Sequence, residues 1–259
     1  MKAFRSSKAL VYSGVLTKKV KLYIHKLGYF LSIVLPLNLI WEKLHRKNYH
    51  PDAAGIKDRI VADRKNPGES LFSWWGDRLK IDIELKNLSV LEIGHGGAWF
   101  LAQALDLGAE SATGVEISSE LNIRASKVLN ELGYRDFQLL LGNGKDLSVL
   151  SGRSFDLIFS NTVFQHLPTR TARKYLGEIS KLLSEEGFCL IQALLSKTSS
   201  YKRLSSADLF SVAYNKEEFA NLLIEANLHV SNFAQVEYGS PDTYWGIYLL
   251  KRGCGFREL

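Results

Sequence analysis

From about residue 87, short apolar runs alternate with segments whose apolar residues recur at helical spacing. The apolar runs are bounded by glycine and polar residues and predict five strands, at 89–93, 112–117, 137–141, 155–159 and 188–194. The helical segments are predicted at 99–107, about 119–132 and 170–183. Strands that alternate with helices form a mainly parallel sheet that helices cover on both faces.

The C-terminal part of the chain carries a different pattern. Asn215 and Glu218 have the spacing of a capping box, which opens a helix. Two strands are predicted near 230–238 and 243–250, joined by a turn, and they form an antiparallel hairpin at the sheet edge. The whole pattern predicts an α/β fold: a Rossmann-like seven-stranded, mostly parallel sheet with helices on both faces and an antiparallel C-terminal hairpin, plus a basic and apolar N-terminal helical segment.

The N-terminal segment differs in charge from the rest of the chain. The net charge is +6, yet residues 1–50 hold ten Lys and Arg against one acidic residue, so the remainder is net negative. An apolar run at 27–41 is shorter than the roughly 20 residues that span a bilayer. Two interpretations remain: helices packed over the main domain, or a peripheral anchor in residues 1–47 on an anionic membrane surface.

The cysteine content limits the compartment and the metal chemistry. Cys189 and Cys254 are the two cysteines, and they lie far apart in the sequence. This number supports neither a disulfide framework nor a zinc site, and we predict no metal. We expect a cytoplasmic chain, with membrane association through the N-terminal segment as the alternative.

A glycine-rich turn follows the first predicted strand. Such a turn lets the backbone approach a ligand at the carboxyl edge of a sheet. A dinucleotide-binding turn would need a small residue where Trp99 stands, so the spacing G-x-G-x-[GA], from Gly94 through Gly96 to Ala98, fits the chain better. This turn indicates a nucleotide-like ligand other than a dinucleotide.

An acidic residue ends the second predicted strand. Glu116 stands 22 residues after Gly94, where a carboxylate can accept hydrogen bonds from both ribose hydroxyls of an adenosine group. The alternative is a helix-capping or solvated acid. The glycine turn upstream favours the ribose role.

Four blocks, in this order, resemble the class I S-adenosylmethionine-dependent methyltransferases, the small-molecule branch in particular. They are VLEIGHGGA, GVEIS, LGNG and FDLIFSNTVFQHLP. The resemblance covers about residues 88–193 well and 194–250 loosely. It implies S-adenosylmethionine as cofactor, and the residues implied to bind it are Glu92, Gly94, His95, Gly96, Glu116, Ile117, Asn143, Gly144 and Asn161.

The resemblance also implies roles for single residues. Ile117 would lie against the adenine, and Asn161 would lie beside the methionyl group. The chain departs from the family pattern at three places. Ala98 replaces a glycine, His95 replaces a smaller or uncharged residue, and Asn143 replaces an aspartate. The Asn143 carbonyl oxygen can still accept from the adenine amino group, whereas His95 either lines the methionine pocket or points to solvent.

The catalytic prediction concerns one histidine. Displacement at a sulfonium methyl group is direct, so positioning and exclusion of water supply much of the catalysis. A hydroxyl acceptor gains from a general base, and His166, which follows the fourth strand, is the candidate. The alternative is a structural histidine. Residues 161–164 lack the Pro-Pro-aromatic sequence of enzymes that methylate the amino groups of nucleic-acid bases.

The resemblance divides the chain into an N-terminal helical segment with substrate cap, at 1–80, and a methyltransferase domain at 81–259. The cap candidates are 72–76 and 197–214. In the first, Trp74 and Trp75 either stack on an acceptor or belong to the core; in the second, Tyr214 is a weaker candidate of the same kind.

We therefore predict a methyltransferase for a small-molecule, lipid or glycan-type acceptor, with oxygen as the favoured target atom. Two alternatives stay open. One is an RNA methyltransferase guided by the basic N-terminus, although nucleic acid is the less favoured partner. The other is a catalytically silent module that keeps the cofactor site.

Overall fold

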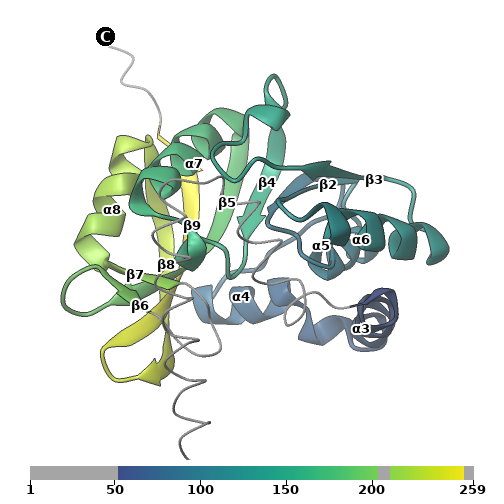
Figure 1. Ribbon diagram of the computed structural model, residues 1–259, viewed down its shortest axis with the longest axis horizontal. Coiled ribbons are helices and arrows are strands. Elements are labelled where there is room, and N and C mark those ends of the chain that lie inside the picture. Colours follow the sequence, from purple (N-terminus) through teal and green to yellow (C-terminus); the bar gives the residue numbers. More distant parts are fainter. Residues whose placement is uncertain (1–51, 204–210, 254–259) are drawn as a thin grey trace, which may run out of the picture.

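A computed structural model describes residues 52–203 and 211–253. The main sheet runs in the order β3-β2-β1-β4-β5-β9-β8, parallel from β3 to β5 and antiparallel from β5 to β8 (Figure 1). Its strands are β1 (Ser89–Ile93), β2 (Ser111–Glu116), β3 (Phe137–Leu141), β4 (Phe155–Ser160), β5 (Leu183–Ser196), β8 (Leu228–Ser240) and β9 (Thr243–Arg252). The mostly parallel sheet and its C-terminal antiparallel hairpin are as predicted, but within the described residues the sheet has nine strands, two more than predicted.

Two further short strands were not predicted from the sequence. They are β6 (Tyr201–Arg203) and β7 (Ser211–Asn215), which pair with each other in antiparallel fashion. β7 also pairs in parallel with the last two residues of β5, where Leu195 faces Tyr214 and Ser196 faces Asn215. β5 extends beyond the end of β4, so β7 lies beside β5 at the carboxyl edge of the sheet.

Helices cover both faces of the sheet, as predicted (Figure 1). One face carries α3 (Ala53–Lys65), α4 (Leu71–Leu79), α5 (Trp99–Asp106) and α6 (Ser119–Glu131). The other carries α7 (Thr169–Leu182) and α8 (Lys216–Glu225). Four of these helices begin at side-chain caps, and α6 and α8 are two of them. The Ser118 hydroxyl accepts from the Leu121 amide, and the Asn215 carbonyl oxygen accepts from the Glu217 and Glu218 amides, as the capping pattern predicts.

The alternation of side chains along the strands separates two hydrophobic cores. In β1, Leu91 and Ile93 pack under α7, while Val90 packs under α5 with Leu157 and Phe159 of β4. All five of these side chains are buried. Because the central strands are covered on both faces, they are apolar almost throughout, which is why their sequence signal is strong.

The described part of the N-terminal segment belongs to the folded domain. α3 packs against α5 and α6, and α4 packs against β8 and β9. Trp75 of α4 is fully buried, with its ring edge-on to Phe72 and Phe159. Trp74 is half-buried, with the Arg78 guanidinium 4.2 Å from its ring centroid. Neither tryptophan lines the ligand pocket, so the hypothesis that they stack on an acceptor is wrong and the core interpretation holds.

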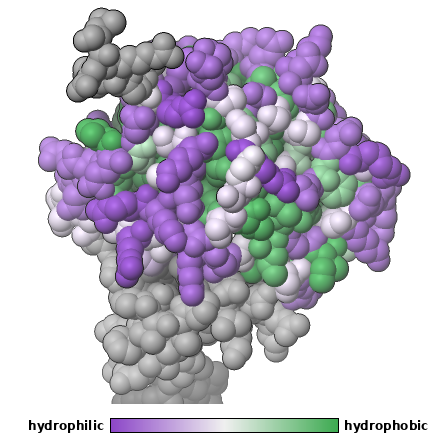
Figure 2. Space-filling view, turned by 90° about the horizontal axis from the view of Figure 1, so that it is seen from above, coloured by the Kyte–Doolittle hydropathy of each residue, from purple (hydrophilic) through white to green (hydrophobic). Residues whose placement is uncertain are grey.

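Several predictions concern residues outside the described ranges. They are the anchor in residues 1–47, its apolar run at 27–41 and the position of Cys254. Within 52–203 and 211–253, no helix has the length and apolarity needed to cross a membrane, and no cluster of His, Cys, Asp and Glu is arranged to hold a metal ion. On the face in Figure 2, hydrophilic side chains cover most of the described surface, with smaller apolar areas between them.

Candidate active site

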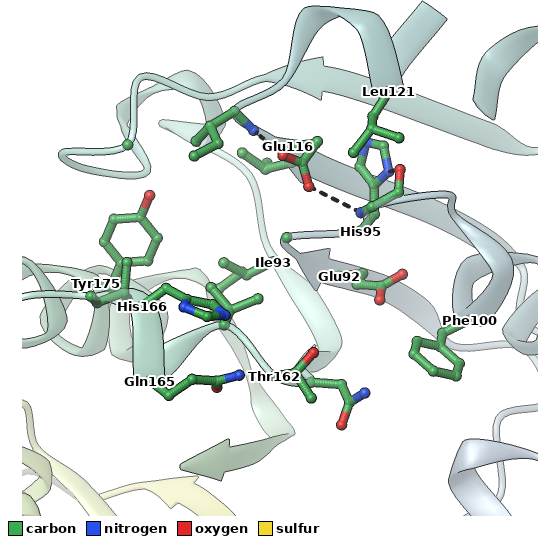
Figure 3. Close-up of a pocket in the computed structure, with 18 of the residues that line it drawn as sticks. Glu92, Ile93, His95, Phe100, Glu116, Leu121, Thr162, Gln165, His166 and Tyr175 are labelled. Carbon is green, nitrogen blue, oxygen red and sulfur yellow. Dashed lines mark hydrogen bonds between the residues drawn. The ribbon is translucent and has the colours of Figure 1, made fainter. Parts of the chain in front are cut away.

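A pocket of about 470 Å³ opens at the carboxyl ends of β1, β2 and β4. Parallel α/β sheets place ligands at this edge. The turn after β1, the end of β2, the short 3₁₀ helix η3 (Phe164–His166) and the β8–β9 hairpin all contribute lining residues. Figure 3 shows side chains from several of these elements converging on the cavity.

The glycine turn leaves space for a ligand. Gly94 has a φ of +75°, and a Cβ there would lie 2.3 Å from Val163, so a larger residue cannot fit. Gly96 has a φ of +53°, and a Cβ there would meet nothing within 4 Å. Because Gly96 lines the pocket, the open space next to its Cα is part of the cavity. Ala98 takes the third position, also left-handed with a φ of +57°.

Glu116 is held rigidly at the end of β2. One carboxylate oxygen accepts from the Gly96 amide at 3.0 Å, and the other accepts from the amides of Ile117 at 2.8 Å and Ser118 at 3.0 Å (Figure 3). The side chain is 6% exposed and lines the pocket. These bonds connect the two predicted cofactor blocks and leave one lone-pair site, on the oxygen that accepts from Gly96, for a further donor.

His95 is buried and does not point to solvent. Its Nδ1 lies 3.1 Å from the backbone carbonyl oxygen of Gly96, and its Nε2 lies 3.1 Å from the side-chain oxygen Oδ1 of Asn122. The side-chain amide of Asn122 in turn donates to the backbone carbonyl oxygens of Glu116 and Ser118, and these bonds fix the orientation of the Asn122 side chain. Burial lowers the pKa of His95 despite the nearby Glu116 carboxylate. The ring therefore links the glycine turn to α6.

Glu92 is a buried acid without a complete set of partners. It is 1% exposed, lines the pocket, and its Oε2 has no hydrogen-bond partner within the described structure. Burial, together with the charge of Glu116, raises the pKa of Glu92 well above its usual range. A buried polar oxygen with no donor calls for a ligand or water. Figure 3 shows Glu92 between His95 and Phe100.

Asn143 is placed away from the predicted adenine contact. Its carbonyl oxygen accepts from the amides of Lys145 and Asp146, and its amide group donates to the Asp146 carboxylate. The side chain is exposed and does not line the pocket, whereas Gly144 and Ile117 do. The local turn uses the oxygen that the adenine would need, so we remove Asn143 from the candidate cofactor contacts.

The segment after β4 brings the catalytic candidate into the pocket. Asn161 and His166 are both half-buried lining residues. The His166 imidazole lies beside Ile93 in the middle of the site (Figure 3). Tyr214 positions this segment from β7, because its hydroxyl donates to the carbonyl oxygens of Phe164 and Leu167, at 3.1 and 2.6 Å. Tyr214 is thus a buried structural residue and not an acceptor contact.

Sequence reasoning missed a group of lining residues. They are Trp99 and Phe100 at the start of α5, Gln165 in η3, Tyr175 in α7, and Tyr238 and Trp245 in the β8–β9 hairpin. The hairpin was predicted only as a pair of edge strands, and that prediction did not place its aromatic residues near the ligand.

Comparison with known proteins identifies the domain. Residues 91–191 match a family model described as a methyltransferase domain. A stretch of 55 residues is 47% identical to a protein-L-isoaspartate O-methyltransferase from Gloeobacter violaceus, covering 21% of this chain and 26% of that one. The chain therefore spans about a quarter of the length of this curated relative.

Solved structures of low sequence identity share the fold. The 1,6-didemethyltoxoflavin-N1-methyltransferase of Burkholderia thailandensis aligns with a TM-score of 0.56 at 17% identity, covering 78% of this chain and 89% of its own. The magnesium protoporphyrin IX methyltransferase of Synechocystis PCC 6803, with bound cofactor, aligns with a TM-score of 0.55 at 14% identity, covering 82% and 97%. Residues 91–191 are therefore a methyltransferase domain, and the chain has the fold of S-adenosylmethionine-dependent methyltransferases.

The methyltransferase pocket fits its cofactor, S-adenosylmethionine. The cofactor brings two ribose hydroxyls and an ammonium group, all of them hydrogen-bond donors. Glu116 offers a rigid carboxylate, and Glu92 offers a buried oxygen without a partner. The space above Gly96 is open to the pocket. The folded chain thus holds carboxylate oxygens in place that are suited to accept from such donors.

Proposed function

We propose that the chain transfers the methyl group of S-adenosylmethionine to an oxygen atom of a small-molecule acceptor, with His166 as general base. One observation carries the proposal. A single cavity contains the cofactor candidates Glu92, Gly96 and Glu116, the imidazole of His166 and an apolar wall. A cavity of this size is in the range of small-molecule sites, roughly 300–1,000 Å³.

The residues would divide the cofactor between them. Glu116 would accept from the ribose hydroxyls, and Glu92 would pair with the methionyl ammonium group. Ile117 and Gly144 line the pocket beyond Glu116 and would border the adenine, while Asn161 would lie beside the methionyl group. This arrangement supports binding with the sulfonium directed toward the η3 segment.

The cofactor supplies an electrophilic methyl group, so the chain has three tasks: to orient the acceptor, to exclude water and to remove a proton. In line attack needs the acceptor oxygen opposite the sulfur, and holding it there accounts for much of the rate gain. His166 lines the same cavity as the cofactor candidates and lies beside Ile93 (Figure 3). Its imidazole would take the hydroxyl proton as the new bond to carbon forms.

Substitution of Glu116 tests the ribose contact. Glu116→Ala should weaken S-adenosylmethionine binding by about 1–3 kcal/mol, the scale of a lost buried hydrogen-bond partner. Calorimetric titration measures this effect. The matched control is Glu110→Ala, because Glu110 is exposed and precedes the opposite end of β2.

Glu116 also accepts three backbone amides, so a fold defect must be separated from a lost contact. Thermal unfolding of each variant, without ligand, provides this separation. Unchanged affinity in a folded Glu116→Ala protein would remove Glu116 from the ribose site.

The raised pKa of Glu92 predicts a pH-dependent affinity. Pairing with an ammonium group requires the carboxylate form, so binding releases a proton wherever Glu92 is protonated in the free protein. S-adenosylmethionine affinity should therefore rise with pH, by up to tenfold per unit, and level off above the pKa of Glu92 in the free folded protein. Calorimetry in two buffers of different ionisation enthalpy counts the released proton.

Glu92→Gln should abolish both the slope and the proton release. In the protein without ligand, stability changes with pH in the direction opposite to the affinity. The folded state holds the proton more tightly than the unfolded state, so the free energy of unfolding should fall as pH rises through the folded-state pKa. A wild-type affinity that is flat with pH would contradict the ammonium contact.

A further inference from the structure

The pocket lining includes aromatic and apolar residues that the proposed cofactor contacts do not use. They are Trp99 and Phe100 from α5, Tyr238 and Trp245 from the β8–β9 hairpin, and Leu194 from β5. We refer to these five residues as the aromatic chamber. We propose that the aromatic chamber binds an uncharged, planar aromatic acceptor that donates a hydrogen bond to Gln165. This inference rests on the proposed methyl transfer and names the class of molecule that receives the group.

Two pairs of rings form the walls of the chamber. Trp99 and Phe100 meet at 84° with centroids 6.1 Å apart, and Tyr238 and Trp245 meet at 61° with centroids 4.8 Å apart. Each pair is therefore edge-to-face, and the Arg59 guanidinium lies over one face of Trp99 and of Phe100. A planar aromatic guest can stack on a face and meet an edge, and each such contact is worth about 0.5–1.5 kcal/mol beyond area burial.

The charge of the lining disfavours an anionic acceptor. Among the described lining residues there is no Lys or Arg, and the two charged side chains, Glu92 and Glu116, are acidic. The nearest cation on the aromatic wall is Arg59 of α3, whose guanidinium lies 4.4 Å from the Trp99 ring centroid. Arg59 is outside the lining and forms an ion pair with Asp63. A carboxylate or phosphate in the chamber would thus lack a lining cation to offset its desolvation.

Gln165 supplies the polar contact. It is 6% exposed and lines the pocket, and its Oε1 is buried without a hydrogen-bond partner within the described structure. Figure 3 shows its side chain reaching from η3 toward Thr162, below His166. An unpaired buried carbonyl oxygen favours a ligand that donates to it. An aromatic hydroxyl or ring N–H would satisfy Gln165 while remaining near His166.

The test uses three probes of matched size on the full chain saturated with S-adenosylhomocysteine. They are 2-naphthol, its saturated analogue decahydro-2-naphthol, and the anionic 6-hydroxynaphthalene-2-sulfonate. Calorimetry should show 2-naphthol binding at least about fivefold more tightly than either of the others. Tighter binding of the saturated probe would indicate an aliphatic acceptor, and tighter binding of the sulfonate would indicate an anionic one. Either result, or no binding of 2-naphthol, overturns the proposal.

Variants connect the binding to the chamber. Trp245→Ala should weaken 2-naphthol binding about tenfold, Trp245→Phe should keep most of it, and Trp74→Ala, outside the pocket, should not change it. Gln165→Leu should weaken 2-naphthol binding but leave naphthalene binding unchanged. Equal binding of 2-naphthol to Trp245→Ala and wild type would overturn the assignment to this chamber.

The same titrations separate the two proposals. Each protein is first titrated with S-adenosylhomocysteine alone, and the chamber variants should keep the wild-type affinity. Wild-type protein that fails to bind S-adenosylhomocysteine contradicts the proposed methyl transfer. Binding of S-adenosylhomocysteine with no preference among the three probes contradicts only the aromatic acceptor.

Discussion

Replacing His166 by glutamine should lower kcat by about 10²–10⁴-fold, the usual contribution of a general base, and leave the affinity for S-adenosylmethionine unchanged. Glutamine keeps a polar side chain of similar reach at the centre of the cavity but cannot take up a proton near neutral pH. The rate of S-adenosylhomocysteine formation, measured with an acceptor that turns over, checks the prediction. 2-Naphthol is the first such acceptor to use.

The pH profile distinguishes a base from a positioning residue. As the pH approaches about 10, a phenolic acceptor ionises by itself, so the deficit of His166→Gln should shrink. A positioning role would leave the deficit constant with pH. The matched control is His229→Gln, because His229 is exposed on β8 and does not line the pocket. An unchanged kcat in His166→Gln would exclude His166 as the base.

Replacing Trp75 by alanine should cost about 3–5 kcal/mol of unfolding free energy, the scale of removing a fully buried aromatic side chain. Trp75 is 0% exposed and packs against Phe72 and Phe159, so its loss opens a cavity between α4 and the sheet. Urea unfolding followed by circular dichroism measures the change. In a chain of this size each kcal/mol corresponds to about 2–4 °C in Tm.

Two other variants test the reason for this cost. Trp75→Phe should lose much less stability, because the ring volume largely remains and the indole N–H that it removes has no hydrogen-bond partner within the described structure. Trp74→Ala removes a half-buried ring and should cost about 1 kcal/mol. Similar losses in Trp74→Ala and Trp75→Ala would contradict the placement of α4.

Much of the sheet was predictable because its strands are covered on both faces. β1 and β3 begin and end at the predicted residues, and the helix that follows Asn215 begins at its predicted cap. β5 begins at Leu183, earlier than predicted, because two exposed glutamates and a glycine near its start resemble a turn. β7 escaped prediction because it joins the sheet through only two residues of β5, which leaves a weak local pattern.

The cofactor end of the site was more predictable than the acceptor end. Gly94, Gly96 and Glu116 belong to local motifs at the ends of β1 and β2, and the parallel pairing of these strands brings them together. Gln165 and Trp245 reach the pocket only because η3 and the β8–β9 hairpin meet at one sheet edge. For Asn143 the motif indicated the correct turn but not the role of the side chain. Its side-chain oxygen accepts hydrogen bonds within that turn and does not face the pocket.

Calorimetric titration of the full chain with S-adenosylmethionine and S-adenosylhomocysteine, with NAD as control, tests the identity of the ligand. We expect both adenosyl ligands to bind at one site with micromolar affinity and NAD not to bind, because Trp99 occupies the position where a dinucleotide turn needs a small residue. Absence of adenosyl-ligand binding, or binding of NAD in its place, would contradict the claim that this pocket is a methyltransferase site.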